Sequence, residues 1–146
     1  MDSKTDYLFK NNFNLKLYMK LNGKKAYFSH SIKTYNTIDE EEEFEFLQNF
    51  FNGNIICPNN HSHLFVNESD YTDIFRLVDV LIVSEYNGYV GKGSFKDCET
   101  AYRKGIPIYL IERNGSSFNF RLVVDFVEVS NFNPIEYGNL VSISLD

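Results

Sequence analysis

The stretch that decides the fold is Val78–Glu112, with the sequence VDVLIVSEYNGYVGKGSFKDCETAYRKGIPIYLIE. The apolar, β-branched run Val78–Val83 predicts a buried strand, and a loop rich in glycine follows it. Ser94–Lys104 has the pattern of a helix that ends at Gly105, and Ile106–Ile111 predicts a second strand. A strand, a loop, a helix and a parallel strand form a unit in which ligands bind beyond the carboxyl ends of the strands.

The rest of the chain continues this alternation of buried strands and helices. Thr37 and Glu40 have the spacing of a capping box, which predicts the start of a helix, and a short helix is expected from Ser69 to Leu77. Alternating strands and helices favour a Rossmann-like or flavodoxin-like three-layer α/β sandwich with a mainly parallel sheet. Core strands are expected at Lys25–Ser29, Asn54–Cys57, Val78–Ser84 and Ile106–Ile111, and antiparallel strands near the C-terminus at Arg121–Val129 and Leu140–Leu145.

The N-terminal part has a different pattern. Phe13–Leu21 alternates apolar and polar residues, which is typical of a half-buried strand, and Asn22-Gly23 is a strong signal for a two-residue hairpin turn. Residues 13–29 are therefore expected to form a β-hairpin that feeds the sheet as an antiparallel addition. Residues 1–12 are polar and are expected to be loosely ordered, and residues 1–146 are interpreted as a single domain.

Composition argues against several classes of function. The formal charge of −6 disfavours nucleic acid as a partner, and no apolar run reaches the ~18 residues of a membrane span. Cys57 and Cys98 form neither a disulfide framework nor a CxxC site, and the N-terminus has no signal-peptide pattern, so a reducing cytoplasm is expected. His61 and His63 have no third ligand at a recognisable spacing, and we therefore expect no metal and no cofactor.

Several residues could carry chemistry at the carboxyl edge of the predicted sheet. Glu99 lies one to two turns inside the predicted helix, either as a surface residue paired with Arg103 or as a nucleophile or acid beneath the glycine loop. Ser29 and His30 end a predicted strand and belong to the same edge. The acidic run Asp39–Glu43 is expected to be a solvated helix start rather than a metal site. The loop could cradle an anion or form a plain connecting turn, and its glycines are Gly88, Gly91 and Gly93.

The order of these segments resembles small proteins related to nucleoside 2-deoxyribosyltransferases. Tyr27–Thr37, with the sequence YFSHSIKTYNT, resembles the aromatic strand, turn and acidic helix that open those proteins, and Ile55–Asn59 is similar to their second strand and its exit. Val78–Val83 resembles a later core strand. Gly91–Pro107 is the most similar segment, with a small-residue loop, a glutamate-bearing helix and a Gly-Ile-Pro turn. The resemblance covers roughly Tyr27–Ile111.

This resemblance implies cleavage or transfer of the N-glycosidic bond of a (deoxy)nucleoside or nucleoside monophosphate, with Glu99 as the nucleophile. The departing base needs a proton, and the sequence leaves His30, Asp79, Asp97 or a partner subunit open for that role. Other residues would offer an aromatic face to the base or hydrogen-bond donors to a 5′-phosphate. These substrate-binding candidates are Tyr27, Ser29, Tyr35, Tyr86, Tyr89, Gly88, Gly91, Gly93 and Ser94.

The chain also departs from the pattern of that family. Ser31 and Asn36 replace a Pro and a Gly, and Gly93 stands where the transferases often carry an Asp. An incomplete acid–base set favours the alternative of a non-catalytic module that binds a nucleotide or an ADP-ribose-like ligand, and an interaction protein that keeps only the scaffold is a third interpretation. Because the related transferases complete their sites with a neighbouring chain, a homo-oligomer is expected, most simply a homodimer.

Overall fold

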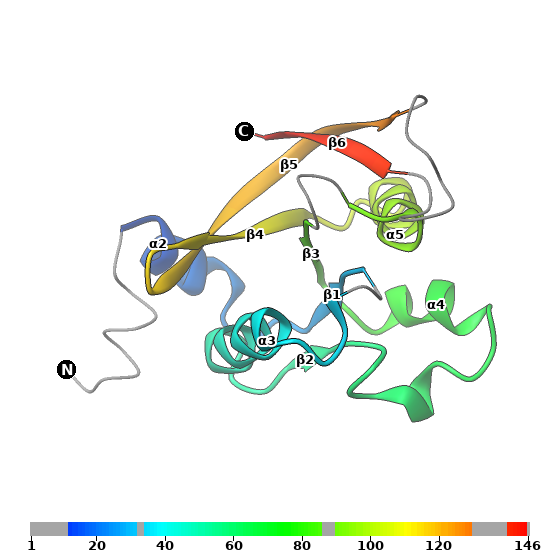
Figure 1. Ribbon diagram of the computed structural model, residues 1–146, viewed down its shortest axis with the longest axis horizontal. Helices are drawn as coiled ribbons and strands as arrows, with labels where there is room; N and C mark the ends of the chain where they lie inside the picture. Colours follow the sequence, from blue (N-terminus) through cyan, green and yellow to red (C-terminus); the bar gives the residue numbers. More distant parts are fainter. Residues whose placement is uncertain (1–11, 32–33, 86–89, 130–139, 146) are drawn as a thin grey trace.

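The structure is built on a mixed sheet in which parallel strands dominate (Figure 1). The computed structural model describes residues 12–31, 34–85, 90–129 and 140–145. The strands are β1 (Ala26–Ser29), β2 (Ile55–Ile56), β3 (Val80–Ser84), β4 (Ile108–Asn114), β5 (Ser117–Val129) and β6 (Leu140–Leu145). Within the described residues they form a six-stranded sheet with the order β2-β1-β3-β4-β5-β6. The first four strands run parallel, and β5 and β6 add antiparallel pairs at one edge.

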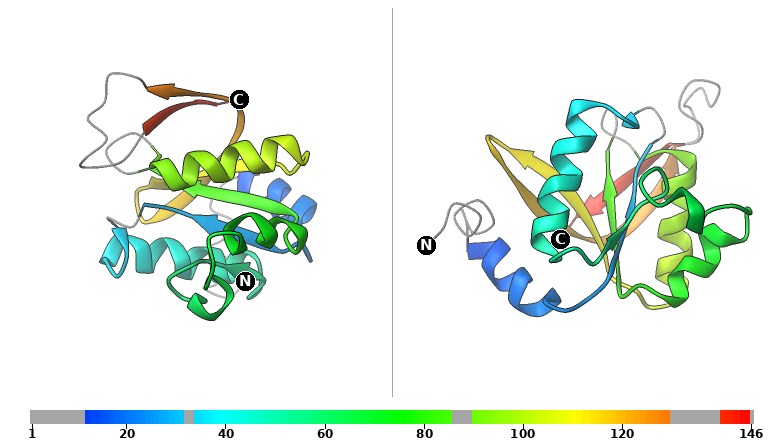
Figure 2. Two further views of the ribbon diagram at one scale, coloured as in Figure 1. Left: turned by 90° about the vertical axis from the view of Figure 1, so that its right-hand side faces the viewer. Right: turned by 90° about the horizontal axis from the view of Figure 1, so that it is seen from below.

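Helices cover both faces of this sheet, which gives three layers (Figure 2). The helical segments are α2 (Asn12–Leu21), α3 (Ile38–Phe50), the 3₁₀ turn η2 (Ser62–Leu64), α4 (Asp70–Asp73), the 3₁₀ turn η3 (Ile74–Arg76) and α5 (Lys92–Arg103). Residues of α2 and α3 form one apolar cluster with one face of the sheet, and residues of η3 and α5 form a second cluster with the other face. The predicted three-layer α/β sandwich is therefore confirmed.

Successive residues of the central strand β3 alternate between these two apolar clusters. Val80 and Ile82 belong to the cluster with α3, whereas Leu81 and Val83 belong to the cluster with α5. Because both faces are covered, the strand needs apolar residues at every position, which explains the continuous run that predicts it. Its pairing with β1 on one side and β4 on the other confirms that it is a core strand.

The two long helices that flank the sheet also follow the sequence. The Thr37 hydroxyl oxygen accepts a hydrogen bond from the Glu40 backbone N–H at 3.2 Å and so caps α3 as predicted. The helix predicted from Ser94 is α5, which begins two residues earlier at Lys92. The helix expected at 69–77 is divided into the short segments α4 and η3.

The predicted β-hairpin over residues 13–29 is wrong, because Asn12–Leu21 forms the helix α2. The alternating pattern places Leu17 and Leu21 four residues apart, which puts them on one helical face, and both are buried. Met19, which a half-buried strand would place on the same side as these leucines, is 73% exposed. The helix therefore buries only some of the apolar residues that alternate with polar ones in this segment.

The Asn-Gly pair that predicts a hairpin turn instead follows the end of α2. Gly23 has φ of 82°, a left-handed conformation that commonly terminates a helix. An antiparallel partner for β1 would also have no place, since β2 and β3 already flank that strand in parallel. Of the residues predicted to be loosely ordered, 1–11 lie outside the described part of the chain.

Truncations in α2 test this correction. Leu17→Ala should lower the free energy of unfolding by roughly 2–3 kcal/mol, because it leaves a cavity in the cluster beneath α2. Met19→Ala should change that free energy by less than about 0.5 kcal/mol, since its side chain is exposed. Urea denaturation measures both values, and equal losses at the two positions would argue for the strand.

Candidate functional site

The carboxyl ends of β1 and β3 meet at the topological switch point of the sheet. From β1 the chain crosses to β2 on one side and then returns to β3 on the other side. Ser29, the last residue of β1, is in register with Val83 of β3, so the two strand ends lie side by side. In flavodoxin-like sheets, ligands bind in the crevice beyond these strand ends. This edge is therefore the candidate functional site.

On the α5 side of the edge, a carboxyl group is buried among hydroxyl groups. Asp97 of α5 accepts a hydrogen bond from Ser29 Oγ at 2.6 Å, and Ser29 Oγ lies 2.9 Å from Ser94 Oγ. The Tyr27 hydroxyl also hydrogen-bonds Asp97. We call Tyr27, Ser29, Ser94 and Asp97 the α5 cluster. None of its members is more than 8% exposed, so it joins the end of β1 to the first turns of α5 in a water-poor environment.

Burial raises the pKa of the Asp97 carboxyl to about 7, and the hydrogen bonds from Ser29 and Tyr27 oppose this shift only in part. Near neutral pH the group is therefore present in both its protonated and its ionised form. Such a carboxyl group can give a proton to a leaving group and take one from an incoming group. Asp97 is thus well suited to acid–base chemistry at this edge.

On the α3 side of the edge, His30 follows Ser29 and lies on the opposite face of β1. Its Nε2 shares a hydrogen bond with Glu40 Oε2. Asn59 Nδ2 lies 2.9 Å from each Glu40 carboxylate oxygen, and the Asn36 backbone N–H donates to Oε1 at 3.0 Å. We call His30, Glu40 and Asn59 the α3 cluster. Burial lowers the pKa of His30, and Glu40 opposes this shift, so the imidazole is neutral near pH 7.

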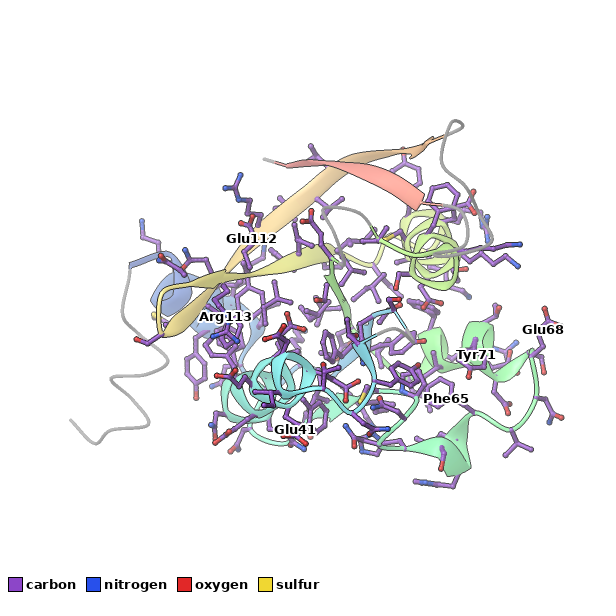
Figure 3. All side chains as sticks on the ribbon, in the orientation of Figure 1. Glu41, Phe65, Glu68, Tyr71, Glu112 and Arg113 are labelled. Carbon is purple, nitrogen blue, oxygen red and sulfur yellow. The ribbon has the colours of Figure 1, made fainter. Side chains whose placement is uncertain are left out.

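A third acid lies at the end of β3. Ser84 Oγ donates a hydrogen bond to the Glu43 carboxyl, with distances of 2.9 and 3.1 Å to its two oxygens. Burial raises the pKa of Glu43 to about 7, and the hydrogen bond from Ser84 lowers it in part. Arg113, which lies beside α3 in Figure 3 and pairs with Glu42 at 3.1 Å, also favours the ionised form of Glu43. The edge therefore carries acids from both flanking helices.

The structure brings together five of the predicted site residues. Tyr27, Ser29 and Ser94 lie in the α5 cluster, and His30 lies in the α3 cluster. The Tyr35 ring is 4.9 Å from the His30 ring, centroid to centroid. Asp97, one of the groups left open for proton transfer, is the acid at the centre of the α5 cluster.

Two of the predicted catalytic residues lie elsewhere. Glu99 follows Asp97 by two residues and so lies about 200° around the helix, on another, partly buried face of α5. Asp79 precedes β3 at the amino edge of the sheet, where its carboxylate accepts a hydrogen bond from the Lys25 backbone N–H at 3.0 Å. In the part of the chain that the structure describes, neither carboxylate hydrogen-bonds to the α5 or α3 cluster.

The glycine loop is only partly described. Gly88 lies outside the described residues, as do Tyr86 and Tyr89. Gly91 is the N-cap of α5 and provides no side-chain cap for the first backbone N–H groups of the helix. A Cβ at Gly93 would meet no atom of the described residues within 4 Å.

Glu40 and Glu43 are the acids of the site that the sequence interpretation missed, and their partners Asn59 and Ser84 were missed with them. The prediction that the acidic run is a solvated helix start is wrong for Glu40, which is 3% exposed, and Glu43 is partly buried. Their spacing held the signal, because Glu40, Glu43, Leu47 and Phe50 follow the i, i+3, i+7 and i+10 pattern of one helical face. Extending the apolar periodicity of α3 back toward its N-terminus would have placed both acids against the sheet.

Neither metal-binding groups nor similarity to known proteins assign a function. Within the described residues, no three His, Cys, Asp or Glu side chains are grouped so that they could hold a metal ion. No helix in the same ranges is long and apolar enough to cross a membrane. Comparisons with protein-family models, with curated proteins and with solved structures found no match to this chain. The chemistry of the site and the resemblance in the sequence are therefore the basis for a proposal.

The raised pKa of Asp97 predicts a pH-dependent stability. An unfolded Asp titrates near pH ~3.9, so between about pH 4 and 7 the folded protein holds a proton that the unfolded chain has lost. Asp97 thus makes the free energy of unfolding fall as pH rises through this window. Asp97→Asn should remove that dependence and stabilise the protein at pH ~8 by on the order of 1–4 kcal/mol.

Urea denaturation of both proteins at pH ~5 and ~8 measures this effect. Glu43 contributes a slope of the same sign in both proteins, so the informative quantity is the difference between variant and wild type. The same pH slope in both proteins would show that Asp97 is ionised at neutral pH.

Proposed function

We propose that the edge between β1 and β3 binds a (deoxy)nucleoside or nucleoside monophosphate and cleaves or transfers its N-glycosidic bond. The observation that carries the proposal is the buried Asp97 carboxyl, because its pKa of about 7 suits a group that protonates a leaving base at neutral pH. Its position at the switch point of a flavodoxin-like sheet supports the same conclusion. The nucleoside as substrate comes from the sequence resemblance over Tyr27–Ile111.

Each part of the site has a role in this proposal. Asp97 supplies the proton that the departing base requires, and the hydroxyl groups of the α5 cluster hold its carboxyl in place. The first turn of α5, which has no side-chain cap, receives a 5′-phosphate together with Ser94. The partly exposed ring of Tyr35 offers a face to the base. Glu99 is the nucleophile that the resemblance implies, and Asp97 is the acid.

Two near-isosteric variants separate these assignments. Asp97→Asn should lower the release of free base by roughly a hundredfold or more, because the amide cannot transfer a proton. Glu99→Gln should lower it by less than about tenfold if Glu99 is a flank residue of α5, and by a hundredfold or more if it is the nucleophile. Chromatography of deoxynucleosides and their monophosphates after incubation measures the release, with circular dichroism as the control for folding. Equal release by wild type and Asp97→Asn would refute the role of Asp97.

A non-catalytic binding module is the second candidate function. It is favoured by the observation that Ser29 hydrogen-bonds to Ser94 and to Asp97, and that all three residues are at most 8% exposed. The same incubation distinguishes the two candidates, because a binder releases no base. Titration calorimetry with nucleoside monophosphates and ADP-ribose would then give saturable binding. The homodimer stays a prediction, which light scattering would test.

A further inference from the structure

The His30 ring is held in one orientation by its neighbours. The Phe28 ring stacks on it with centroids 4.3 Å apart and an interplanar angle of 10°, and the Tyr35 ring lies 4.9 Å away. Its Nε2 is joined to Glu40. His30 and Glu40 are only 7% and 3% exposed. The ring cannot turn without disrupting these contacts, so the directions of its two nitrogen atoms are fixed.

The partners of Glu40 indicate which nitrogen of His30 carries the proton. The Asn59 side chain and the Asn36 backbone both donate N–H groups to the Glu40 carboxyl. Because each Glu40 oxygen already accepts a hydrogen bond from one of these N–H groups, the carboxyl group fits the acceptor-only form, and its bond with His30 then requires an N–H on Nε2. A neutral imidazole with its proton on Nε2 has a lone pair on Nδ1.

Within the described residues, no protein group hydrogen-bonds to this Nδ1 atom. Among the buried side-chain nitrogen and oxygen atoms of the described residues, it is the one that the structure leaves unsatisfied. The Phe28 carbonyl influences the pKa of His30 and would favour the opposite tautomer, but it makes no hydrogen bond of good geometry with Nδ1. A buried, unpaired acceptor is unfavourable for folding, and its retention in a native structure calls for a role.

We propose that Glu40 is a positioning residue that holds His30 with Nδ1 as an unprotonated acceptor, the general base at the end of β1. This role rests on the proposed function, and it identifies water as the group that attacks C1′ directly, in the place that the resemblance gives to the Glu99 carboxylate. An O–H bond of water breaks and its proton goes to Nδ1, while the oxygen bonds to C1′. The C1′–N bond breaks, and its electron pair leaves with the base, which takes the proton of Asp97. The acid and the base come from the two faces of β1, and both lie at its carboxyl end.

Nitrogen-15 NMR spectroscopy of the His30 ring tests the positioning without any need for activity. In the wild type at neutral pH, Nε2 should carry a proton and Nδ1 should not. In Glu40→Gln the pKa of His30 should fall, because the carboxylate that favours the charged ring is gone. Among the described residues, the titratable groups beside the ring are Glu40 of α3 and Tyr35 of the segment before α3.

The pH profile of base release tests the catalytic part. Release should decrease as acid protonates Nδ1, and in Glu40→Gln this decrease should move to lower pH, with kcat lowered by about tenfold or more and KM little changed. Glu41→Gln is the matched control, because Glu41 is the next acid of α3 and lies on its outer side (Figure 3). It should leave the profile and the His30 resonances as they are in the wild type.

The results distinguish the positioning of His30 by Glu40 from the proposed cleavage of the N-glycosidic bond. A proton on Nδ1 in the wild-type spectrum overturns the positioning, even where Glu40→Gln fails to fold. A folded Glu40→Gln variant with an unchanged His30 pKa and pH profile also overturns it. The predicted tautomer together with no release of base by the wild type supports the positioning of His30 by Glu40 and refutes the proposed function.

Discussion

The site depends on one constraint, the position of β1 between two parallel neighbours. Because β2 and β3 fix this strand on both sides, its successive side chains must point alternately to the two faces of the sheet. Ser29 therefore meets α5, and His30 meets α3. A shift of one residue in the register of β1 would exchange these partners and bury His30 against Asp97 instead of Glu40. The geometry of both polar clusters follows from this single strand end.

The clusters use burial to alter the chemistry of ordinary side chains. Asp97 of α5 and Glu43 of α3 are shielded from water, and this desolvation raises the pKa of each carboxyl group to about 7. Hydroxyl groups from the strand ends, Ser29 and Ser84, donate to these carboxyls and limit the shift. An acid with a raised pKa lowers stability at neutral pH, and such groups are concentrated at functional sites. The α5 cluster therefore lowers the free energy of unfolding at neutral pH, which a purely structural contact would not be expected to do.

The sequence was sufficient for the core of the fold because its signals are local and strong. Apolar runs predict β1 to β4, and the capping residue Thr37 and the Ser94–Lys104 pattern predict α3 and α5. The N-terminal helix was missed because alternation over Phe13–Leu21 satisfies a strand template while Leu17 and Leu21 also satisfy a helical one. Only the parallel pairing of β1 on both sides, a tertiary fact, decides between them.

Part of the candidate site could be predicted from the sequence, because local signals locate the strand ends. Strand ends can be located from sequence, so Ser29, His30 and Ser94 were expected at the right edge. The choice between Asp97 and Glu99 depends on which face of α5 meets the sheet. Cys98 and Ala101 are buried with Asp97, which follows the helical period, whereas Glu99 lies on another face. The resemblance over Gly91–Pro107 could not decide between Asp97 and Glu99, which are two residues apart. Both carboxyl groups fit a pattern of a loop followed by an acidic helix.

The proposed chemistry requires that Asp97 is protonated in a substantial fraction of molecules at neutral pH. A carbon-13 NMR titration of its side-chain carboxyl, assigned by comparison with Asp97→Asn, measures this directly. The carboxyl carbon should titrate with a midpoint at about pH 7. A midpoint near the ~3.9 of an unperturbed Asp would contradict the claim, because the group would then be ionised throughout the neutral range and could not deliver a proton to a leaving base.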